Sequence, residues 1–219
     1  MAAPKKRSRR RNLPRSRSHA QLGQHFFRSG AIARQIVRSL GLRKNDSVLE
    51  LGAGEGFFTS LIAPEVRSIA AIDIDQELIV RLNARFQETS NVRILRKVIT
   101  STIDFGDYDV VFGNIPFNRT SDVFRKVIKP PVRFDSCHLI VQAEAAYRLL
   151  GSGRPTEMAL IAYPFVEVRI GMRIPRWAYR PAPSVDTVVL HFRTRKTPLI
   201  SRSAYRDFGS FVKAVMRSG

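Results

Sequence analysis

Residues 49–56 read Leu-Glu-Leu-Gly-Ala-Gly-Glu-Gly and follow Val48, so a short apolar run leads directly into three glycines. An apolar run of this length predicts a buried strand, and helix-like residues follow at 57–63. Glycine lets the backbone turn sharply and approach a ligand closely, because it has no side chain. A glycine loop between a strand and a helix is typical of the ligand-binding edge of an α/β sheet.

The glycine spacing and a nearby acid narrow the kind of ligand. No Gly-Lys-Ser or Gly-Lys-Thr follows, which excludes a phosphate-binding loop, and the spacing differs from the dinucleotide pattern Gly-x-Gly-x-x-Gly. A second strand is predicted at 68–72, and Asp73 ends it. A carboxylate at that edge can accept hydrogen bonds from both hydroxyls of a ribose. The alternative is a plain tight turn with a solvated acid at a strand end.

Strand-like and helix-like segments alternate along the rest of the chain. This alternation predicts an α/β fold of the Rossmann-like kind, with a mainly parallel central sheet covered on both faces. The further strands are predicted at 92–95, 109–112 and 137–141, with a closing β pair at 165–170 and 185–192. The further helices are predicted at 29–41, around 78–82, at 123–128 and up to residue 150.

The stretch that indicates the chemistry is Asn114-Ile115-Pro116-Phe117, directly after a predicted strand. Pro116 has a fixed φ, which holds the Ile115 carbonyl in place. That carbonyl and the Asn114 side-chain oxygen can each accept one hydrogen of an exocyclic amine, and Phe117 offers a face for a planar base. Two such acceptors would aim the lone pair of an adenine N6 at a methyl donor, which is catalysis by orientation. The alternative is a strand-terminal turn with a core phenylalanine.

Together these motifs resemble the rRNA adenine-N6 methyltransferase family, which includes the Erm macrolide-resistance enzymes and the KsgA-type dimethylases. The match runs from about residue 21 to 195. It implies a class I S-adenosylmethionine-dependent methyltransferase fold, with Asn114 to Phe117 as the catalytic motif. The cofactor-binding residues that the resemblance implies are Gln24, His25, Phe26, Glu50, Gly52, Gly54, Gly56, Asp73, Ile74 and Asn114.

A late segment, Tyr179 to Val185, resembles the family pattern Phe/Tyr-x-Pro-x-Pro-x-Val. The resemblance implies that the Tyr179 ring lies near the target base, together with Phe117. Arginines at 169, 173, 176 and 180 cluster around this segment, so Arg176 and Arg180 are predicted to contact RNA phosphates. Trp177 is interpreted as a core anchor, with base stacking as the alternative.

Two positions depart from the family pattern. His25 stands where the family usually has Asn, and Val98 stands where it usually has an Asp that binds the adenine amine of the cofactor. Asp104 would substitute for that acid only if the loop were shifted. Both departures bear on cofactor affinity and methyl-donor positioning.

The charge of the chain indicates a polyanionic partner. The 219 residues carry a net charge of +19, which favours nucleic acid first and an anionic membrane surface second. Residues 1–19 hold eight basic residues and no acid, and are predicted to be a disordered basic arm for RNA. A solubilising tail and a mitochondrial transit peptide remain open for this segment.

Composition also excludes several classes of protein. The single cysteine, Cys137, allows no disulfide within the chain, and no Cys/His spacing suits zinc. No apolar run approaches the ~20 residues that span a bilayer. We therefore expect no metal and no membrane partner, and a monomer in the bacterial cytoplasm.

The predicted organisation is a basic arm at 1–19, a methyltransferase domain at 20–198, and the start of a truncated helical C-terminal region at 199–219. Ile rather than Leu at position 115 leans towards the Erm side of the family. This implies methylation of an adenine N6 in 23S rRNA, before full ribosome assembly, with macrolide-lincosamide-streptogramin B resistance. The alternatives are a KsgA-type dimethylase of small-subunit rRNA and an RNA-binding assembly factor without catalysis.

Overall fold

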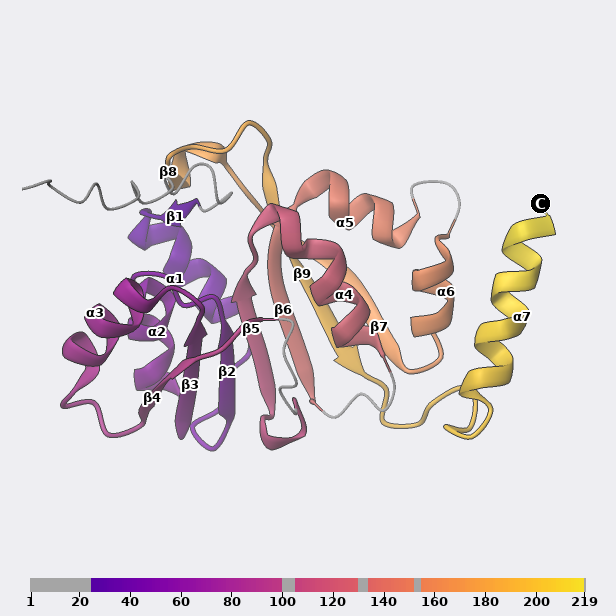
Figure 1. Ribbon diagram of the computed structural model, residues 1–219, viewed down its shortest axis with the longest axis horizontal. Coiled ribbons are helices and arrows are strands. Elements are labelled where there is room, and N and C mark those ends of the chain that lie inside the picture. The colour runs from indigo at the N-terminus through magenta and orange to yellow at the C-terminus, as the bar shows by residue number, and fades with distance from the viewer. Residues whose placement is uncertain (1–24, 100–104, 130–133, 152–154, 219) are drawn as a thin grey trace, which may run out of the picture.

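A computed structural model describes residues 25–99, 105–129, 134–151 and 155–218. Its centre is a seven-stranded sheet in the order β4-β3-β2-β5-β6-β9-β7 (Figure 1). All neighbouring pairs from β4 to β6 are parallel, whereas β9 is antiparallel to both of its neighbours. The prediction of an α/β fold with a mainly parallel sheet is confirmed. The strands are β2 (Ser47–Leu51), β3 (Ser68–Asp73), β4 (Val92–Arg96), β5 (Val110–Asn114), β6 (Ser136–Gln142), β7 (Val166–Ile174) and β9 (Thr187–Thr194).

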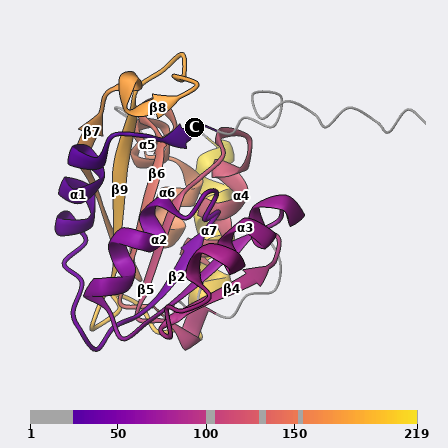
Figure 2. The same ribbon diagram turned by 90° about the vertical axis from the view of Figure 1, so that its left-hand side faces the viewer.

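Helices cover both faces of this sheet (Figures 1 and 2). One face carries α1 (Gly30–Ser39), α2 (Phe57–Ile62) and α3 (Gln76–Phe86). The other carries α4 (Thr120–Ile128), α5 (Ala143–Leu150) and α6 (Glu157–Ala162). A last helix, α7 (Tyr205–Ser218), lies beyond α6 at the end of the molecule. The helix α7 lies within the range 199–219 that was predicted to begin a helical region, and the domain boundaries stay predictions.

Local signals explain where the helices begin. The Ser29 hydroxyl accepts a hydrogen bond from the Ile32 N–H, which caps α1 as its position in the sequence predicts. The Asp75 carboxylate accepts from the Glu77 and Leu78 N–H groups and caps α3 in the same way. Each cap satisfies backbone donors that a helix start leaves without a partner.

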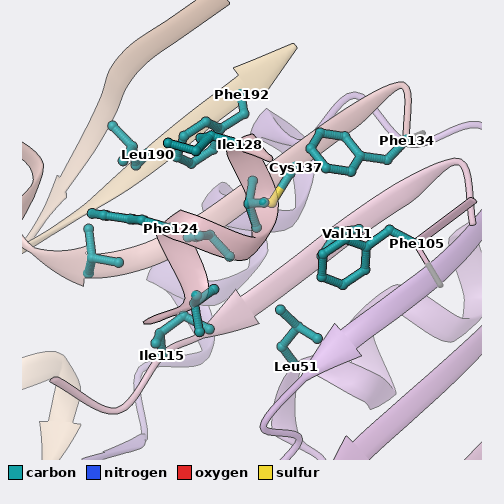
Figure 3. Close-up of a cluster of buried hydrophobic side chains, with 14 of the residues drawn as sticks. Leu51, Phe105, Val111, Ile115, Phe124, Ile128, Phe134, Cys137, Leu190 and Phe192 are labelled. Carbon is teal, nitrogen blue, oxygen red and sulfur yellow. The ribbon is translucent and has the colours of Figure 1, made fainter. Parts of the chain in front are cut away.

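The core is divided by the sheet into two main layers of side chains. On one face, α1 and α2 pack on alternate residues of β2, β3 and β5. On the other face, the helix α4 inserts Phe124 and Ile128 against the strands (Figure 3). Cys137 is fully buried in this second layer, as expected for a small core residue. Figure 3 also shows Leu51, Phe105, Val111, Ile115, Phe134, Leu190 and Phe192 in this layer.

Three features differ from the sequence predictions. The apolar run at 158–168 divides at Pro164, so that α6 precedes β7, and α6 was not predicted. A two-residue ribbon pairs β1 (Phe26–Phe27) with β8 (Tyr179–Arg180), which local patterns do not reveal. Trp177 is 65% exposed, so its interpretation as a core anchor is wrong. In the part of the chain that the structure describes, no helix has the length and apolar character to cross a membrane.

Candidate active site

A pocket opens at the carboxyl ends of β2, β3 and β5. It is lined by His25–Phe27, the glycine loop at 52–55, Asp73–Ile74 and Asn114–Phe117. These segments are far apart in the sequence, and the parallel sheet brings them to one edge. The structure therefore gathers most of the predicted site residues around a single cavity. Gln24 lies outside the described residues.

The glycine loop has two distinct functions in the structure. Gly52, Gly54 and Gly56 all have positive φ, between +57° and +76°, which side chains rarely adopt. Gly52 and Gly54 face the pocket, whereas Gly56 does not line it. A Cβ on Gly56 would lie 2.7 Å from the side chains of Leu82 and Phe86. Gly56 lets α2 begin against α3, and its predicted contact with the cofactor stays a prediction.

Asp73 connects the glycine loop to the end of β3. Its carboxylate accepts hydrogen bonds from the Gly54 N–H at 2.9 Å and from the Asp75 N–H at 3.0 Å. The side chain is buried beside the pocket, and each carboxylate oxygen has a second lone pair. Asp73 thus holds the loop in shape and still offers acceptors to the cavity. Its contact with ribose hydroxyls stays a prediction.

Glu50 is buried below the loop, where its carboxyl group contacts Thr59. The Thr59 hydroxyl lies 2.5 Å from the Glu50 Oε2. Burial raises the pKa of Glu50 to about 8, and the nearby Asp73 charge adds to the rise, while the Thr59 hydrogen bond opposes it. At neutral pH the Glu50 carboxyl is therefore mostly protonated. It contributes a neutral polar group to the pocket wall rather than a second negative charge.

Asn114 ends β5 and lines the pocket. The amide nitrogen donates a hydrogen bond to the His25 carbonyl oxygen at 3.2 Å, which fixes the orientation of the amide group. Among the described residues, none donates a hydrogen bond to the amide oxygen of Asn114, so no described residue competes with a ligand for this acceptor. The Ile115 N–H donates to the Ile140 carbonyl oxygen, which ties the motif to β6. The Ile115 side chain is buried in the core.

An aromatic pair closes the other side of the mouth. The rings of His25 and Phe117 have centroids 5.0 Å apart and are tilted by 32°. The His25 Nδ1 donates to the Pro181 carbonyl oxygen at 2.8 Å, which ties β1 to the segment after β8. His25, one of the two departures from the family pattern, thus positions both Asn114 and Phe117. The planar surface suits a nucleobase.

The other departure, Val98, does not line the pocket and is 41% exposed. Its neighbour Ile99 contributes to the pocket wall instead. Asp104 lies outside the described residues. Ile74 lines the pocket and is 56% exposed, which leaves its apolar side chain accessible to a planar group.

The structure contradicts the predicted role of Tyr179. Its ring is 3% exposed, packs 4.9 Å from the Phe27 ring, and its hydroxyl lies 2.7 Å from the Thr187 Oγ1. A base cannot stack on a face that the core already covers. Tyr179 anchors β8 to the sheet, and this burial raises the pKa of its hydroxyl.

The two predicted RNA-contact arginines differ in their surroundings. Arg176 lies 3.8 Å from an oxygen of Asp186 and donates to the Ser184 carbonyl oxygen. Arg180 is exposed, and its side chain has no ion pair with any described residue. Contact of either residue with RNA stays a prediction.

Sequence reasoning missed Phe57, Phe58 and Ile99, which complete the apolar part of the pocket wall. Phe57 and Phe58 directly follow the glycine loop, so their position at the start of α2 was the available signal. Ile99 had no such signal, because it lies in the loop after β4. A buried carboxylate beside apolar walls and exposed loop backbone suits a nucleoside. In the described part of the chain, no group of His, Cys, Asp and Glu side chains could hold a metal ion.

The chain matches a family profile described as ribosomal RNA adenine dimethylase over residues 15–218. It belongs to this family. The chain is 30% identical over 188 residues to an rRNA adenine N-6-methyltransferase of Limosilactobacillus reuteri, covering 84% of this chain and 76% of that protein. It is 29% identical over 174 residues to ribosomal RNA small subunit methyltransferase A of Mycoplasma mobile, covering 78% of this chain and 68% of that protein.

Solved structures agree with this assignment. The 23S rRNA methyltransferase ErmE superimposes with a TM-score of 0.74 at 25% identity, covering 86% of this chain and 77% of ErmE. A dimethyladenosine transferase from Plasmodium falciparum shares the fold, with a TM-score of 0.76 at 23% identity, covering 86% of this chain and 70% of that one. The chain is therefore an S-adenosylmethionine-dependent rRNA adenine methyltransferase with the class I fold.

Proposed function

We propose that this enzyme methylates N6 of one adenine in 23S rRNA before the ribosome is fully assembled. The observation that carries the proposal is the amide of Asn114, which lines the pocket beside the aromatic pair of His25 and Phe117, is held by a hydrogen bond to the His25 carbonyl, and has an oxygen without a donor among the described residues. Similarity to the 23S rRNA methyltransferase ErmE supports the Erm-type assignment. Resistance to macrolides, lincosamides and streptogramin B is the expected consequence.

Each wall of the pocket has a part in this reaction. Asp73 would accept hydrogen bonds from the ribose hydroxyls of S-adenosylmethionine, and Ile74, Phe57 and Ile99, which line the same pocket, would contact its adenine. The bound cofactor supplies an electrophilic methyl group. Phe26, which lines the pocket, would contact the methionine end of the cofactor.

The target adenine enters from the side of Phe117 and stacks on its ring. The Asn114 amide oxygen and the Ile115 carbonyl oxygen accept the two hydrogens of the N6 amine. This orients the nitrogen lone pair towards the methyl group. The nitrogen–carbon bond forms as the sulfur–carbon bond breaks, and N6 then releases one proton to water. The hydrogen bond to the His25 carbonyl oxygen already orients the Asn114 amide, so the side chain need not reorganise when the adenine binds.

A specific finding also favours a second candidate, methylation of small-subunit rRNA. Several relatives at 27–30% identity are named ribosomal RNA small subunit methyltransferase A. The same pocket would serve that substrate, because the acceptors recognise an adenine amine and not its RNA context. A third candidate is an RNA-binding assembly factor without catalysis, which the Val98 departure motivates.

The decisive experiment incubates the enzyme with radiolabelled S-adenosylmethionine and protein-free 23S or 16S rRNA, followed by mapping of the modified base. We expect label at N6 of one adenine in 23S rRNA, and none with Asn114→Ala. Label in 16S rRNA alone would replace the proposal by the second candidate. Cofactor binding without any transfer would favour the assembly factor. Expression in a susceptible bacterium, as a cytoplasmic monomer, should raise the inhibitory concentration of a macrolide.

A further inference from the structure

A second hollow lies at the opposite end of the sheet from the active site. It is bounded by the loop after α1, by the start of β6 and by the outer strands β7 and β9. Strand β6 runs between the two sites. Its residue Ile140 pairs with Asn114 at the active site, and Ser136, four residues earlier, pairs with Arg193 beside this hollow. Four residues of strand span about 13 Å, which separates the two positions along β6. We call this hollow the basic groove, defined by Arg43, Arg169, Arg193, Arg195 and Lys196 around its rim.

The floor of the basic groove is a pair of buried histidines. The Nδ1 atoms of His138 and His191 lie 2.6 Å apart, so that one ring donates and the other accepts. The His138 Nε2 also contacts the Ser136 hydroxyl at 3.1 Å. A Cβ on Gly171 of β7 would overlap the His191 Nε2, so the strand can carry no side chain there. The absence of that side chain leaves room for the His191 ring on the sheet.

Three cations on the rim have no acidic partner among the described residues. Arg43 pairs with Asp46 and Asp135, and Arg195 pairs with Glu167. The remaining three are exposed and form no ion pair with any residue that the structure describes: Arg169, Arg193 and Lys196. Uncompensated positive charges around a hollow attract anions.

The pKa values of the two histidines reflect this uncompensated charge. Burial first, and then the charges of the neighbouring histidine and arginines, lower the pKa of His138 to about 3. Burial and the Arg169 charge lower the pKa of His191 as well. The floor is therefore neutral at physiological pH, and the positive potential comes from the rim. Unpaired guanidinium groups above a neutral polar floor can donate hydrogen bonds to phosphate oxygens.

We infer that the basic groove binds the sugar–phosphate backbone of the rRNA at nucleotides distant from the target adenine. This rests on the proposed function only in taking rRNA as the substrate. The volume of about 1210 Å³ exceeds the ~1,000 Å³ upper range of small-ligand pockets, which favours a polymer. Arginine binds phosphate in a bidentate geometry, and the unpaired rim offers two such groups with one lysine. These contacts add affinity and orientation without reading sequence.

The test compares two triple variants of the full chain. In the groove variant, the substitutions are Arg169→Gln, Arg193→Gln and Lys196→Gln. In the control variant, which removes three exposed cations elsewhere, they are Arg81→Gln, Arg148→Gln and Lys213→Gln. Binding is measured at several salt concentrations, with a long rRNA transcript and with a short hairpin that contains the target adenine.

With the long transcript, we expect the groove variant to reduce the slope of log K against log salt by about 2 to 3, at ~0.7–0.9 for each phosphate that is no longer neutralised. The control variant should reduce the slope by less than the value for one phosphate. The short hairpin should be bound and methylated as by the unchanged enzyme, because it cannot reach the groove. Protection of Arg169 and Arg193 from phenylglyoxal by the long transcript gives a second readout.

Equal slopes for the two triple variants, or an equal reduction of affinity for the short hairpin, would overturn the inference. So would a groove variant that binds RNA normally but no longer binds poly-glutamate, because the groove would then recognise an acidic peptide. Methylation of 23S rRNA by the enzyme without substitutions tests the proposed function, and the salt slopes of the variants test this inference. Failure of the enzyme to methylate 23S rRNA refutes the proposed target alone, whereas unchanged slopes in an active enzyme refute the groove alone.

Discussion

The amide nitrogen of Asn114 is held by the His25 carbonyl, and no described residue donates to its oxygen, so substitution of Asn114 tests the chemistry directly. Asn114→Ala removes an oriented acceptor from the amine, and we expect kcat to fall on the order of 10²-fold or more. Cofactor affinity, measured by calorimetry, should change little. Asn83→Ala on α3 is the matched control, since its amide bonds only within its own helix. Near-native turnover by Asn114→Ala would remove this residue from the mechanism.

Substitutions of Asp73 and Asp75 allow the effect on cofactor affinity to be compared with the effect on stability. Asp73→Ala should weaken S-adenosylmethionine binding by about 1.5–3 kcal/mol, the range for hydrogen bonds to a charged group. Asp75→Ala removes the cap of α3 and should cost about 1 kcal/mol of stability, with little effect on affinity. Calorimetry and urea unfolding of both variants check this. An unchanged affinity for Asp73→Ala would move the ribose site elsewhere.

Glu50 predicts a specific dependence of stability on pH. Its pKa is about 8 in the folded protein and near 4.5 when unfolded, so the folded state binds the extra proton between these values. Stability should therefore fall as pH rises through this window. Glu50→Gln mimics the protonated acid and removes the dependence, so its slope should be shallower by about 1.4 kcal/mol per pH unit. Parallel urea unfolding curves at pH 5.5 and 7.5 measure the difference, and identical slopes would contradict it.

Sequence patterns predicted those residues whose positions follow from strand ends. Asp73 and Asn114 end β3 and β5, the parallel strands on either side of β2, so their meeting at one edge is a consequence of topology. Tyr179 was misplaced because its burial depends on Phe27 and Thr187, which come from separate strands. The packing of Gly56 against α3 was not predicted for a similar reason, since α3 lies about 25 residues further along the chain.

At the scale of elements, the junction of the glycine loop with α2 and α3 is the most constrained. Gly56→Ala would place a Cβ 2.7 Å from Leu82 and Phe86 at a φ of +76°. We expect a decrease of about 1–3 kcal/mol in unfolding free energy, as for overpacking in a core. Gly209→Ala on α7 is the control, because nothing lies within 4 Å of the added Cβ. It should stabilise by ~0.5–1 kcal/mol, so equal effects of the two substitutions would refute the packing role.

The elements with strong periodicity were predicted, and those that depend on distant pairing were not. The closing pair of strands β7 and β9 was predicted from two apolar runs in the sequence, at 165–170 and 185–192. The β1–β8 ribbon joins Phe26 to Arg180 through only two residues on each side, too few to leave a pattern. The short helix α6 was not predicted, because its apolar residues continue into β7. The periodicity of such a continuous apolar run does not show where the helix ends and the strand begins.

At the scale of the whole molecule, charge is distributed over both the body and the basic arm. Removal of the eight basic residues of 1–19 from the net charge of +19 leaves +11 on the other 200 residues. The body therefore remains attractive to RNA without the arm, and the basic groove accounts for part of that attraction. Contacts at separated sites should contribute additively to the salt dependence of binding.

The last prediction concerns the arm itself, whose residues lie outside the described part of the chain. Deletion of 1–19 should lower rRNA affinity and reduce the slope of log K against log salt by about 0.7–0.9 for each phosphate that the arm would neutralise. The choice of adenine should survive, because Asn114 and Phe117 recognise the base. Salt titrations on one 23S fragment, with the arm deleted and with the groove substituted, should give reductions that add in the double variant. An unchanged slope on deletion would leave the solubilising or targeting tail as the explanation of the arm, and a changed target base would show that it selects the site.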